Sequence, residues 1–290
     1  MQLSVVIPCR NEADTIGHQL AALAHQEVDF PWEVIVVDNG STDDTVAKTQ
    51  RFTGLVPNLR VIEAPEVAGA SYARNAGARL ASGAWLVFCD ADDVVSGGWL
   101  QAMAEALKDH PVVASRFEGR LLNPGHPDRP LGQLQGIETL WYPPFLNHAG
   151  GSGLGVWREC HLAVAGFDET LRYLEDADYC IRLQFAGYRL HFAATALLHV
   201  RYPENRSGLF RQARLWARAN TALYRRYGVG GQAVAAAWRD YGEGVWRLVQ
   251  KMIKVRNPRV RAALIWQAGW HLGLLEGAVL NRVAPVAEHR

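Results

Sequence analysis

Short apolar runs alternate with amphipathic stretches along the first third of the chain. Four of these runs are rich in β-branched and aromatic residues, as buried strands are, and they span residues 3–8, 32–37, 59–62 and 85–90. Between them, apolar residues at helical spacing predict three helices, over residues 14–26, 44–52 and 69–81. Strands and helices that alternate in this way form βαβ units with right-handed crossovers. The pattern therefore predicts an α/β fold with a mostly parallel, Rossmann-like sheet flanked by helices.

The chain changes character near residue 205. One more apolar run, at residues 193–198, predicts a strand, and amphipathic helical patterns then occupy residues 209–227, 245–256 and 260–280. Four side chains interrupt the last of these patterns: Arg261, Gln267, His271 and Glu276. A membrane span needs about 18 apolar residues without such interruptions, so a helix at a membrane surface or between two copies fits better. We therefore expect two domains, 1–205 and 206–290.

Polar residues follow three of the predicted strands at the point where each strand ends. These strands stop at Pro8, Asp38 and Asp90, and the carboxyl ends of parallel strands meet at one edge, where open α/β folds bind ligands. Asp92 and Asp93 follow Asp90 after one alanine, and grouped carboxylates suit Mg²⁺ or Mn²⁺ serving a phosphate-bearing substrate. The alternative is a solvated acidic turn that caps the next helix.

Composition narrows the class of protein. The chain has 290 residues, 49% of them hydrophobic, which is ample for a buried core. Its four cysteines (Cys9, Cys89, Cys160 and Cys180) show no CxxC spacing, and we expect reduced core thiols of a cytosolic protein. The N-terminus enters a strand at once, without the pattern of a secretory signal peptide.

Charge is distributed unevenly along the chain. Residues 206–290 contain fifteen Lys or Arg and four Asp or Glu, a net charge of +11, whereas residues 1–205 carry −10. The basic part is expected to face something anionic. Two interpretations remain open: an anionic lipid surface, or a homodimer interface or acceptor platform with a solvated basic face. We expect no nucleic-acid partner.

Six motifs in a fixed order carry a resemblance to a known family. They are SVVIP at 4–8 with Asn11 and Glu12, VVDNGSTD at 36–43, ARNAG at 73–77, FCDADD at 88–93, GFDE at 166–169 and EDADYCIRL at 175–183. The chain resembles the family 2 glycosyltransferases of the GT-A fold over roughly residues 1–203. The resemblance implies a nucleotide-binding half at 1–95 and an acceptor or catalytic half at 96–205, followed by the basic helical extension.

The resemblance also implies a set of donor-binding residues. The nucleoside diphosphate sugar would be bound by Pro8, Arg10, Asn11, Glu12, Asp38, Asn39, Arg74, Asp90, Ala91 and Arg201. Asp92 matches the metal-binding aspartate, and Mn²⁺ or Mg²⁺ would stabilise the leaving diphosphate. Asn39 stands where other members carry a second aspartate, so which of Asp38 and Asn39 contacts the base stays open. For Asp38 the alternative role is an Asx-turn that caps a helix.

Catalysis and the rest of the metal shell are placed later in the chain. Asp176 matches the catalytic aspartate that takes a proton from the acceptor hydroxyl, with Glu175 and Asp178 as weaker candidates. The alternative is that these acids only complement the dipole of a helix N-terminus. His199 is predicted to complete the metal shell, and Arg201 lies in a loop suited to covering the diphosphate.

We therefore expect a metal-dependent inverting glycosyltransferase that uses a nucleotide-sugar donor, UDP-sugar favoured, and a hydroxyl acceptor such as a lipid-linked or polysaccharide precursor. We expect it in the cytoplasm, in solution or peripherally on the inner face of the membrane. One alternative is a non-catalytic membrane-surface or scaffold module. Another is a sugar-nucleotide pyrophosphorylase, which should show a glycine-rich basic loop after the first strand, where this chain has CRNE at 9–12.

Overall fold

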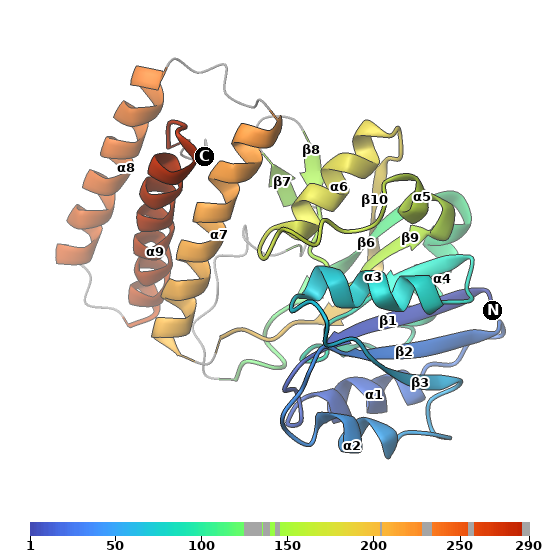
Figure 1. Cartoon of the computed structure of the whole chain (residues 1–290). Helices are drawn as coiled ribbons and strands as arrows, with labels where there is room; N and C mark the ends of the chain where they lie inside the picture. The colour runs from blue at the N-terminus through green and yellow to red at the C-terminus, as the bar shows by residue number, and fades with distance from the viewer. Residues whose placement is uncertain are drawn as a thin grey trace. The chain divides into compact units, whose positions relative to one another are not determined.

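The structure is a computed structural model that describes residues 1–124, 135, 140–142, 146–203, 205–227, 234–254 and 258–285. Two compact units divide the described residues (Figure 1). The first, here called the sheet unit, includes residues 1–122 and 146–201. The second, here called the helical unit, includes residues 202–285. We describe each unit by itself.

The sheet unit is built on an eight-stranded mixed sheet in the described residues. Its strands are β1 (Leu3–Cys9), β2 (Trp32–Asp38), β3 (Leu59–Glu63), β4 (Trp85–Phe88), β5 (Val94–Val95), β6 (Val112–Glu118), β9 (Leu154–Trp157) and β10 (Leu190–His199). They lie in the order β3-β2-β1-β4-β9-β6-β10-β5, and β7 (Leu140–Tyr142) pairs separately with β8 (Leu146–His148). Strands β1 to β4 are parallel, while β9 runs antiparallel between β4 and β6. The predicted α/β class with a mostly parallel mixed sheet is confirmed.

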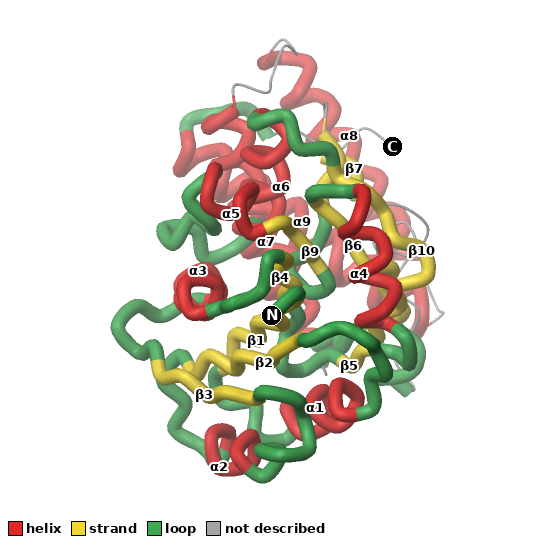
Figure 2. The backbone as a smooth tube through the Cα atoms, turned by 90° about the vertical axis from the view of Figure 1, so that its right-hand side faces the viewer, coloured by secondary structure: helices red, strands yellow, loops and turns green. Residues whose placement is uncertain are grey.

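Helices cover both faces of the parallel part of the sheet. The helices of this unit are α1 (Ile16–Ala24), α2 (Thr45–Gln50), α3 (Ala70–Leu80), α4 (Trp99–Asp109), α5 (Arg158–Ala163) and α6 (Glu175–Phe185). Helices α1 and α2 lie on one face of strands β1 to β3, and α3 lies on the other (Figures 1 and 2). The βαβ units predicted from the apolar pattern are therefore present, with bounds within a few residues of those expected.

Helix α3 packs closely on the sheet because it has a glycine at the contact. A Cβ atom on Gly77 would lie 2.9 Å from a methyl group of Val37 and closer still to Val6. Ala73 and Ala76 are buried on the same helix, whereas Leu80, in its last turn, is 50% exposed.

The carboxyl ends of three parallel strands lie side by side. In the register of the sheet Cys9 is opposite Asp38, and Val6 is opposite Phe88, the last residue of β4. Asp90 follows Phe88 by two residues, so the predicted common edge at Pro8, Asp38 and Asp90 is confirmed. The four cysteines are free and buried, as expected of core thiols.

The helical unit contains α7 (Arg206–Tyr227), α8 (Val234–Lys254) and α9 (Pro258–Asn281). Helix α9 approaches α7 through Gly269, Gly273 and Gly277, where an added Cβ would collide with backbone carbonyl oxygens of α7 or with Thr221. Arg214 on α7 forms a bidentate ion pair with Glu276 on α9, with N–O distances of 2.6 to 3.0 Å. Among the described helices, none has the length and apolarity needed to cross a membrane.

Candidate active site

Three carboxylates meet in the loop between β4 and β5. One carboxylate oxygen from each of Asp90, Asp92 and Asp93 lies within 4.8 Å of those of the other two. Asp93 is buried, while Asp90 and Asp92 are partly exposed. We call this group, at residues 90–93, the acidic turn. Within the described residues, the acidic turn is where three His, Cys, Asp or Glu side chains come close enough together to hold a metal ion.

Hydrogen bonds from distant segments hold the acidic turn in place. The Ser152 hydroxyl donates to Asp93 Oδ2 at 2.6 Å and accepts from the Asp90 backbone N–H at 3.0 Å. The backbone N–H of Arg201 donates to Asp93 Oδ1 at 3.0 Å, and its side-chain Nε–H donates to the Asp92 carbonyl at 3.1 Å. Asp93 is thus a structural anchor, which leaves Asp90 and Asp92 as the more accessible carboxylates.

Crowding of negative charge changes the protonation of the turn. Burial, followed by the charges of Asp90 and Glu12, raises the pKa of Asp92 to about 7. Burial, followed by the charges of Asp92 and Asp90, raises the pKa of Asp93 well above its usual range. A divalent cation would relieve this repulsion, and three hard oxygen donors suit Mg²⁺ or Mn²⁺. The residues present therefore fit such an ion.

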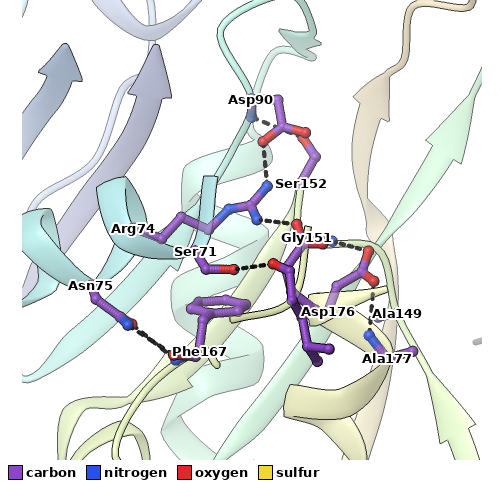
Figure 3. Close-up of polar contacts among 12 residues, drawn as sticks. Ser71, Arg74, Asn75, Asp90, Ala149, Gly151, Ser152, Phe167, Asp176 and Ala177 are labelled. Atoms are coloured by element: carbon purple, nitrogen blue, oxygen red, sulfur yellow. Dashed lines mark hydrogen bonds and ion pairs between the residues drawn. The ribbon is translucent and has the colours of Figure 1, made fainter. Parts of the chain in front are cut away.

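Arg74 on α3 joins the acidic turn to a second acidic group. Its Nη2 lies 2.7 Å from Asp90 Oδ1 and its Nη1 lies 2.9 Å from Glu175 Oε1, and the side chain is only 4% exposed (Figure 3). The guanidinium lies 5.4 Å from the centre of the Phe167 ring. Nearby carboxylates, chiefly Asp90 and then Glu175, raise the pKa of Arg74 although burial opposes this, so Arg74 is a permanent buried cation.

A glycine makes room for this guanidinium. A Cβ atom on Gly151 would lie 2.8 Å from Arg74 Cζ and 2.8 Å from its Nη2. The backbone N–H of Gly151 donates to Asp176 Oδ2 at 3.0 Å (Figure 3). Gly151 therefore contacts both the bridging arginine and the acid predicted to be catalytic.

Glu175 and Asp176, here called the acidic pair, occupy the first turn of α6. The Ala177 backbone N–H donates to Asp176 Oδ1 at 2.8 Å. The pKa of Asp176 is raised overall, because burial outweighs the charge of Arg74 and the two backbone N–H donors, which lower it. Burial and the charge of Asp176 raise the pKa of Glu175 to about 7. Asp178, the third acid of this turn, is fully buried and forms an ion pair with Arg182 at 2.7 Å. Its charge is therefore balanced by a different cation from the one that meets the acidic pair.

The residues predicted to bind the nucleoside lie at the ends of β1 and β2. Asp38 is buried and accepts a hydrogen bond from the Ser41 N–H at 3.1 Å. The donor lies three residues further on, one residue beyond that of an Asx-turn, so Asp38 braces the loop after β2 without forming the predicted turn. Asn39 uses its whole amide to hold the loop between β3 and α3. It donates to the carbonyls of Ala64 and Val67 at 2.5 and 2.8 Å and accepts from the Gly69 N–H at 2.8 Å.

The segment after β1 is tied to the loop after β2. Asn11 Oδ1 accepts from the Thr42 N–H at 2.8 Å, and Glu12 accepts from the Thr15 hydroxyl at 2.6 Å. After burial and Asp90, the negative charge of Glu12 contributes to the raised pKa of Asp92. The other predicted donor-binding residues of this region also lie at or near the strand ends, with Pro8 partly buried in β1, Arg10 exposed and Ala91 buried.

His199 lies at the end of β10, outside the three-carboxylate group. Its Nδ1 is 2.8 Å from Glu118 Oε2, so the ring is oriented by a carboxylate, as metal-binding histidines usually are. Its role as a ligand stays a prediction. Sequence reasoning missed Asp93 and Ser152 as anchors and Gly151 as the contact for Arg74; the glycine-rich run at 150–155 was the available signal.

The sheet order and the acidic turn at its carboxyl edge define the class of protein as a GT-A α/β fold. A mannosyltransferase from Pyrobaculum calidifontis, solved in complex with GDP-Man and Mn²⁺, is similar at a TM-score of 0.65 and 21% identity over 97% of this chain and 87% of that one. S. aureus TarS 1–349, solved in complex with UDP-GlcNAc, is similar at a TM-score of 0.56 and 17% identity over 98% and 93%. At these identities the likeness concerns the fold.

The family model described as glycosyl transferase family 2 matches residues 4–150, just over half of the chain. The chain belongs to this family. The pre-mycofactocin glycosyltransferase of Mycobacterium tuberculosis (strain ATCC 25618 / H37Rv) is 29% identical over 282 residues, which is 89% of this chain and 56% of that protein. The chain thus spans about half the length of the curated relatives that it matches over most of its residues.

Proposed function

We propose that this protein is a metal-dependent, inverting glycosyltransferase that moves a sugar from a nucleoside diphosphate sugar to a hydroxyl acceptor. One observation carries the proposal: Arg74 bridges Asp90 of the acidic turn and Glu175 of the acidic pair. The same guanidinium therefore contacts a site suited to a metal and a diphosphate and a site suited to accepting a proton. Membership of family 2 supports this reading.

On the donor side, Asp90 and Asp92 would hold Mn²⁺ or Mg²⁺, with Asp93 anchoring the turn and His199 as a further predicted ligand. When bound, the ion would neutralise charge on the leaving diphosphate. The nucleoside would lie along the strand ends near Asp38. We favour a UDP-sugar, which the UDP-GlcNAc bound to TarS supports, although the mannosyltransferase neighbour holds GDP-Man.

On the acceptor side, Asp176 would act as the general base. As the acceptor oxygen attacks the anomeric carbon from the face opposite the diphosphate, its proton passes to a carboxylate oxygen of Asp176. The new carbon–oxygen bond forms while the bond to the diphosphate breaks, which inverts the anomeric centre. The N–H groups of Gly151 and Ala177 hold Asp176 in place, and together with the charge of Arg74 they offset part of the rise in its pKa that burial causes.

Three finer points stay proposals. The acceptor is taken to be a lipid-linked or polysaccharide precursor. The partner of the helical unit is an anionic membrane surface or a second copy of the chain. The non-catalytic module remains the alternative from another class, whereas the family match favours sugar transfer over the pyrophosphorylase.

A donor screen tests the proposal. The full chain is incubated with UDP-, GDP- and dTDP-sugars and Mn²⁺ or Mg²⁺, and release of nucleoside diphosphate is measured with and without EDTA. We expect metal-dependent release that falls about 10²–10³-fold in Asp92→Asn and about 10²–10⁴-fold in Asp176→Asn. Asp109→Asn, an exposed acid at the end of α4, is the matched control.

Each result bears on a separate part of the proposal. Turnover that survives EDTA or Asp92→Asn contradicts the metal site, and turnover that survives Asp176→Asn contradicts the assignment of the base. If the protein neither binds nor cleaves any donor in the presence of metal, the non-catalytic alternative is favoured.

A further inference from the structure

Helix α8 presents a row of large apolar side chains to solvent. The exposed fractions are 42% for Trp238, 63% for Trp246, 41% for Val249, 52% for Met252 and 80% for Ile253. Positions 238, 246, 249 and 253 are separated by multiples of three to four residues, so they lie on one face of the helix. We call the four residues in the C-terminal half, Trp246, Val249, Met252 and Ile253, the α8 apolar stripe.

This stripe is not the face that α8 uses to pack within the helical unit. Leu248 and Ala237 are buried, and the Tyr241 hydroxyl donates to the His271 carbonyl of α9 at 2.9 Å. A Cβ atom on Gly244 would meet the His271 ring at 2.8 Å. Positions 237, 241, 244 and 248 therefore face α9, which leaves the stripe on a different side of the helix.

The charges beside the stripe are mostly positive. Arg247 and Lys251 are exposed on α8 within the length of the stripe. Glu243, one turn earlier, lies 3.6 Å from Arg247, and Asp240 precedes both. In the sequence, residues 244–275 contain six Lys or Arg and no Asp or Glu. The apolar stripe therefore lies in a strongly cationic part of the chain, which favours an anionic partner.

Two kinds of partner could bury such a face, and the charge separates them. In a twofold dimer the same patch meets itself, so each copy would bring its own cations against those of the other. An anionic bilayer surface instead takes apolar side chains into the boundary between headgroups and acyl chains, while Lys and Arg contact the lipid phosphates. Tryptophan is also common at this depth.

We propose that the α8 apolar stripe, with Arg247 and Lys251, binds the surface of an anionic lipid bilayer with α8 lying in the plane of the interface. No described helix is long and apolar enough to span a membrane, so the attachment is peripheral in the part of the chain described. This proposal does not rest on sugar transfer and would hold for a non-catalytic chain.

Co-sedimentation of the full chain with vesicles tests the proposal. Vesicles of phosphatidylcholine alone are compared with vesicles that contain phosphatidylglycerol as well, at low and high salt. We expect binding to the anionic vesicles to be at least tenfold stronger, and to fall severalfold in high salt because exposed charges are screened. Each cation replaced should cost about fivefold in binding, measured in Arg247→Gln and Lys251→Gln.

The double variant Trp246→Ser with Ile253→Ser should lose binding at least tenfold. Phe185→Ser, which removes an aromatic ring that is 64% exposed on the sheet unit, is the matched control and should bind as the unaltered chain does. Circular dichroism checks that each variant keeps its helix content.

Equal binding to neutral and anionic vesicles, or full binding by the double variant, overturns the proposal. So does sedimentation velocity that shows a dimer in the unaltered chain and a monomer in the double variant without any vesicle binding, because the stripe is then an interface between copies.

Discussion

The two acidic clusters of the sheet unit differ in what balances their charge. The acidic turn brings three carboxylates within 4.8 Å, and Arg74 pairs with Asp90 at its edge. The acidic pair has two carboxylates, and it meets Arg74 together with the N–H groups of Gly151 and Ala177. The turn also receives hydrogen bonds from the Ser152 hydroxyl and the Arg201 N–H, both on Asp93. It therefore has three donors for three carboxylates, whereas the pair has three donors for two.

The difference indicates different chemistry at the two clusters. In the turn, burial and mutual repulsion raise the pKa of Asp92 to about 7, and a divalent cation would remove that strain. In the pair, burial raises the pKa of Asp176, while the charge of Arg74 and two backbone N–H donors offset part of that rise, which suits the proposed role of this acid as a base. Arg74, which is buried, contacts both clusters. Its removal should therefore change the charge balance of both at once.

Replacing Arg74 should have the largest effect. Arg74→Met leaves the partly buried carboxylates of Asp90 and Glu175 without their cation, which should cost about 3–5 kcal/mol of unfolding free energy and abolish transfer. Urea denaturation and the donor assay measure the two effects. Arg79→Met is the control on the same helix: its side chain is 57% exposed and lies 3.8 Å from Glu169, so it should cost under about 1 kcal/mol. Equal losses in both variants would contradict the bridging role.

Gly151→Ala should disturb the pair and the bridge without removing a charge. The new methyl group would collide with the Arg74 guanidinium, and we expect a loss of about 2 kcal/mol in unfolding free energy together with lower turnover. Gly97→Ala, where an added Cβ meets nothing within 4 Å, is the control and should change stability by less than about 0.5 kcal/mol. Equal stability of the two variants would show that the Arg74 side chain can shift to make room for the methyl group, so that Gly151 is not required at this contact.

The acidic turn should bind metal more weakly as the pH falls. The pKa of Asp92 is raised to about 7, so below that pH an incoming Mn²⁺ must displace a proton, and its affinity should drop about tenfold per pH unit. In the absence of metal, the free energy of unfolding should depend on pH in the opposite direction to the metal affinity. Because the folded pKa lies above the unfolded value of 3.8, the stabilising effect of protonated Asp92 is present below that value and is lost as the pH rises towards 7.

Isothermal titration with Mn²⁺ between pH 5.5 and 8, and thermal melts in EDTA over the same range, check both signs. Asp92→Asn should remove the pH dependence of metal binding along with most of the binding. An affinity that does not change between pH 5.5 and 7 would contradict the raised pKa.

Ser152→Ala should have the smallest effect on stability and metal binding. It should alter the acidic turn without altering the acidic pair. It removes the hydroxyl that donates to Asp93 and accepts from the Asp90 N–H, at a cost of about 1 kcal/mol and a few-fold in Mn²⁺ affinity. The pH profile of turnover, which we propose depends on Asp176, should stay unchanged. Ser207→Ala, an exposed serine that donates to Asn205 in the helical unit, serves as the control. A shift of that pH profile in Ser152→Ala would show that the two clusters are not separable.

Several features of the site could be predicted because they depend on local periodicity and strand direction. The apolar runs predicted the parallel strands, and parallel strands bring the segments after Pro8, Asp38 and Phe88 to one edge whatever the rest of the chain does. Periodicity does not show which apolar residues of a helix are buried: Leu80 in α3 and Phe185 in α6 are 50% and 64% exposed. Helical spacing shows which residues share a face, but not how far the neighbouring sheet extends.

By itself the sequence determined the α/β class, the family motifs and the positions of the carboxylates, because these are properties of short segments. Only the tertiary structure decided how the two acidic clusters are connected. Arg74 meets Asp90 and Glu175, and Ser152 meets Asp93, across separations of 16, 101 and 59 residues. Contacts at such separations depend on strand order, above all on the antiparallel strand β9 next to β4, which brings Gly151 and Ser152 to the site. The charge balance of a buried site is therefore a property of the packed fold.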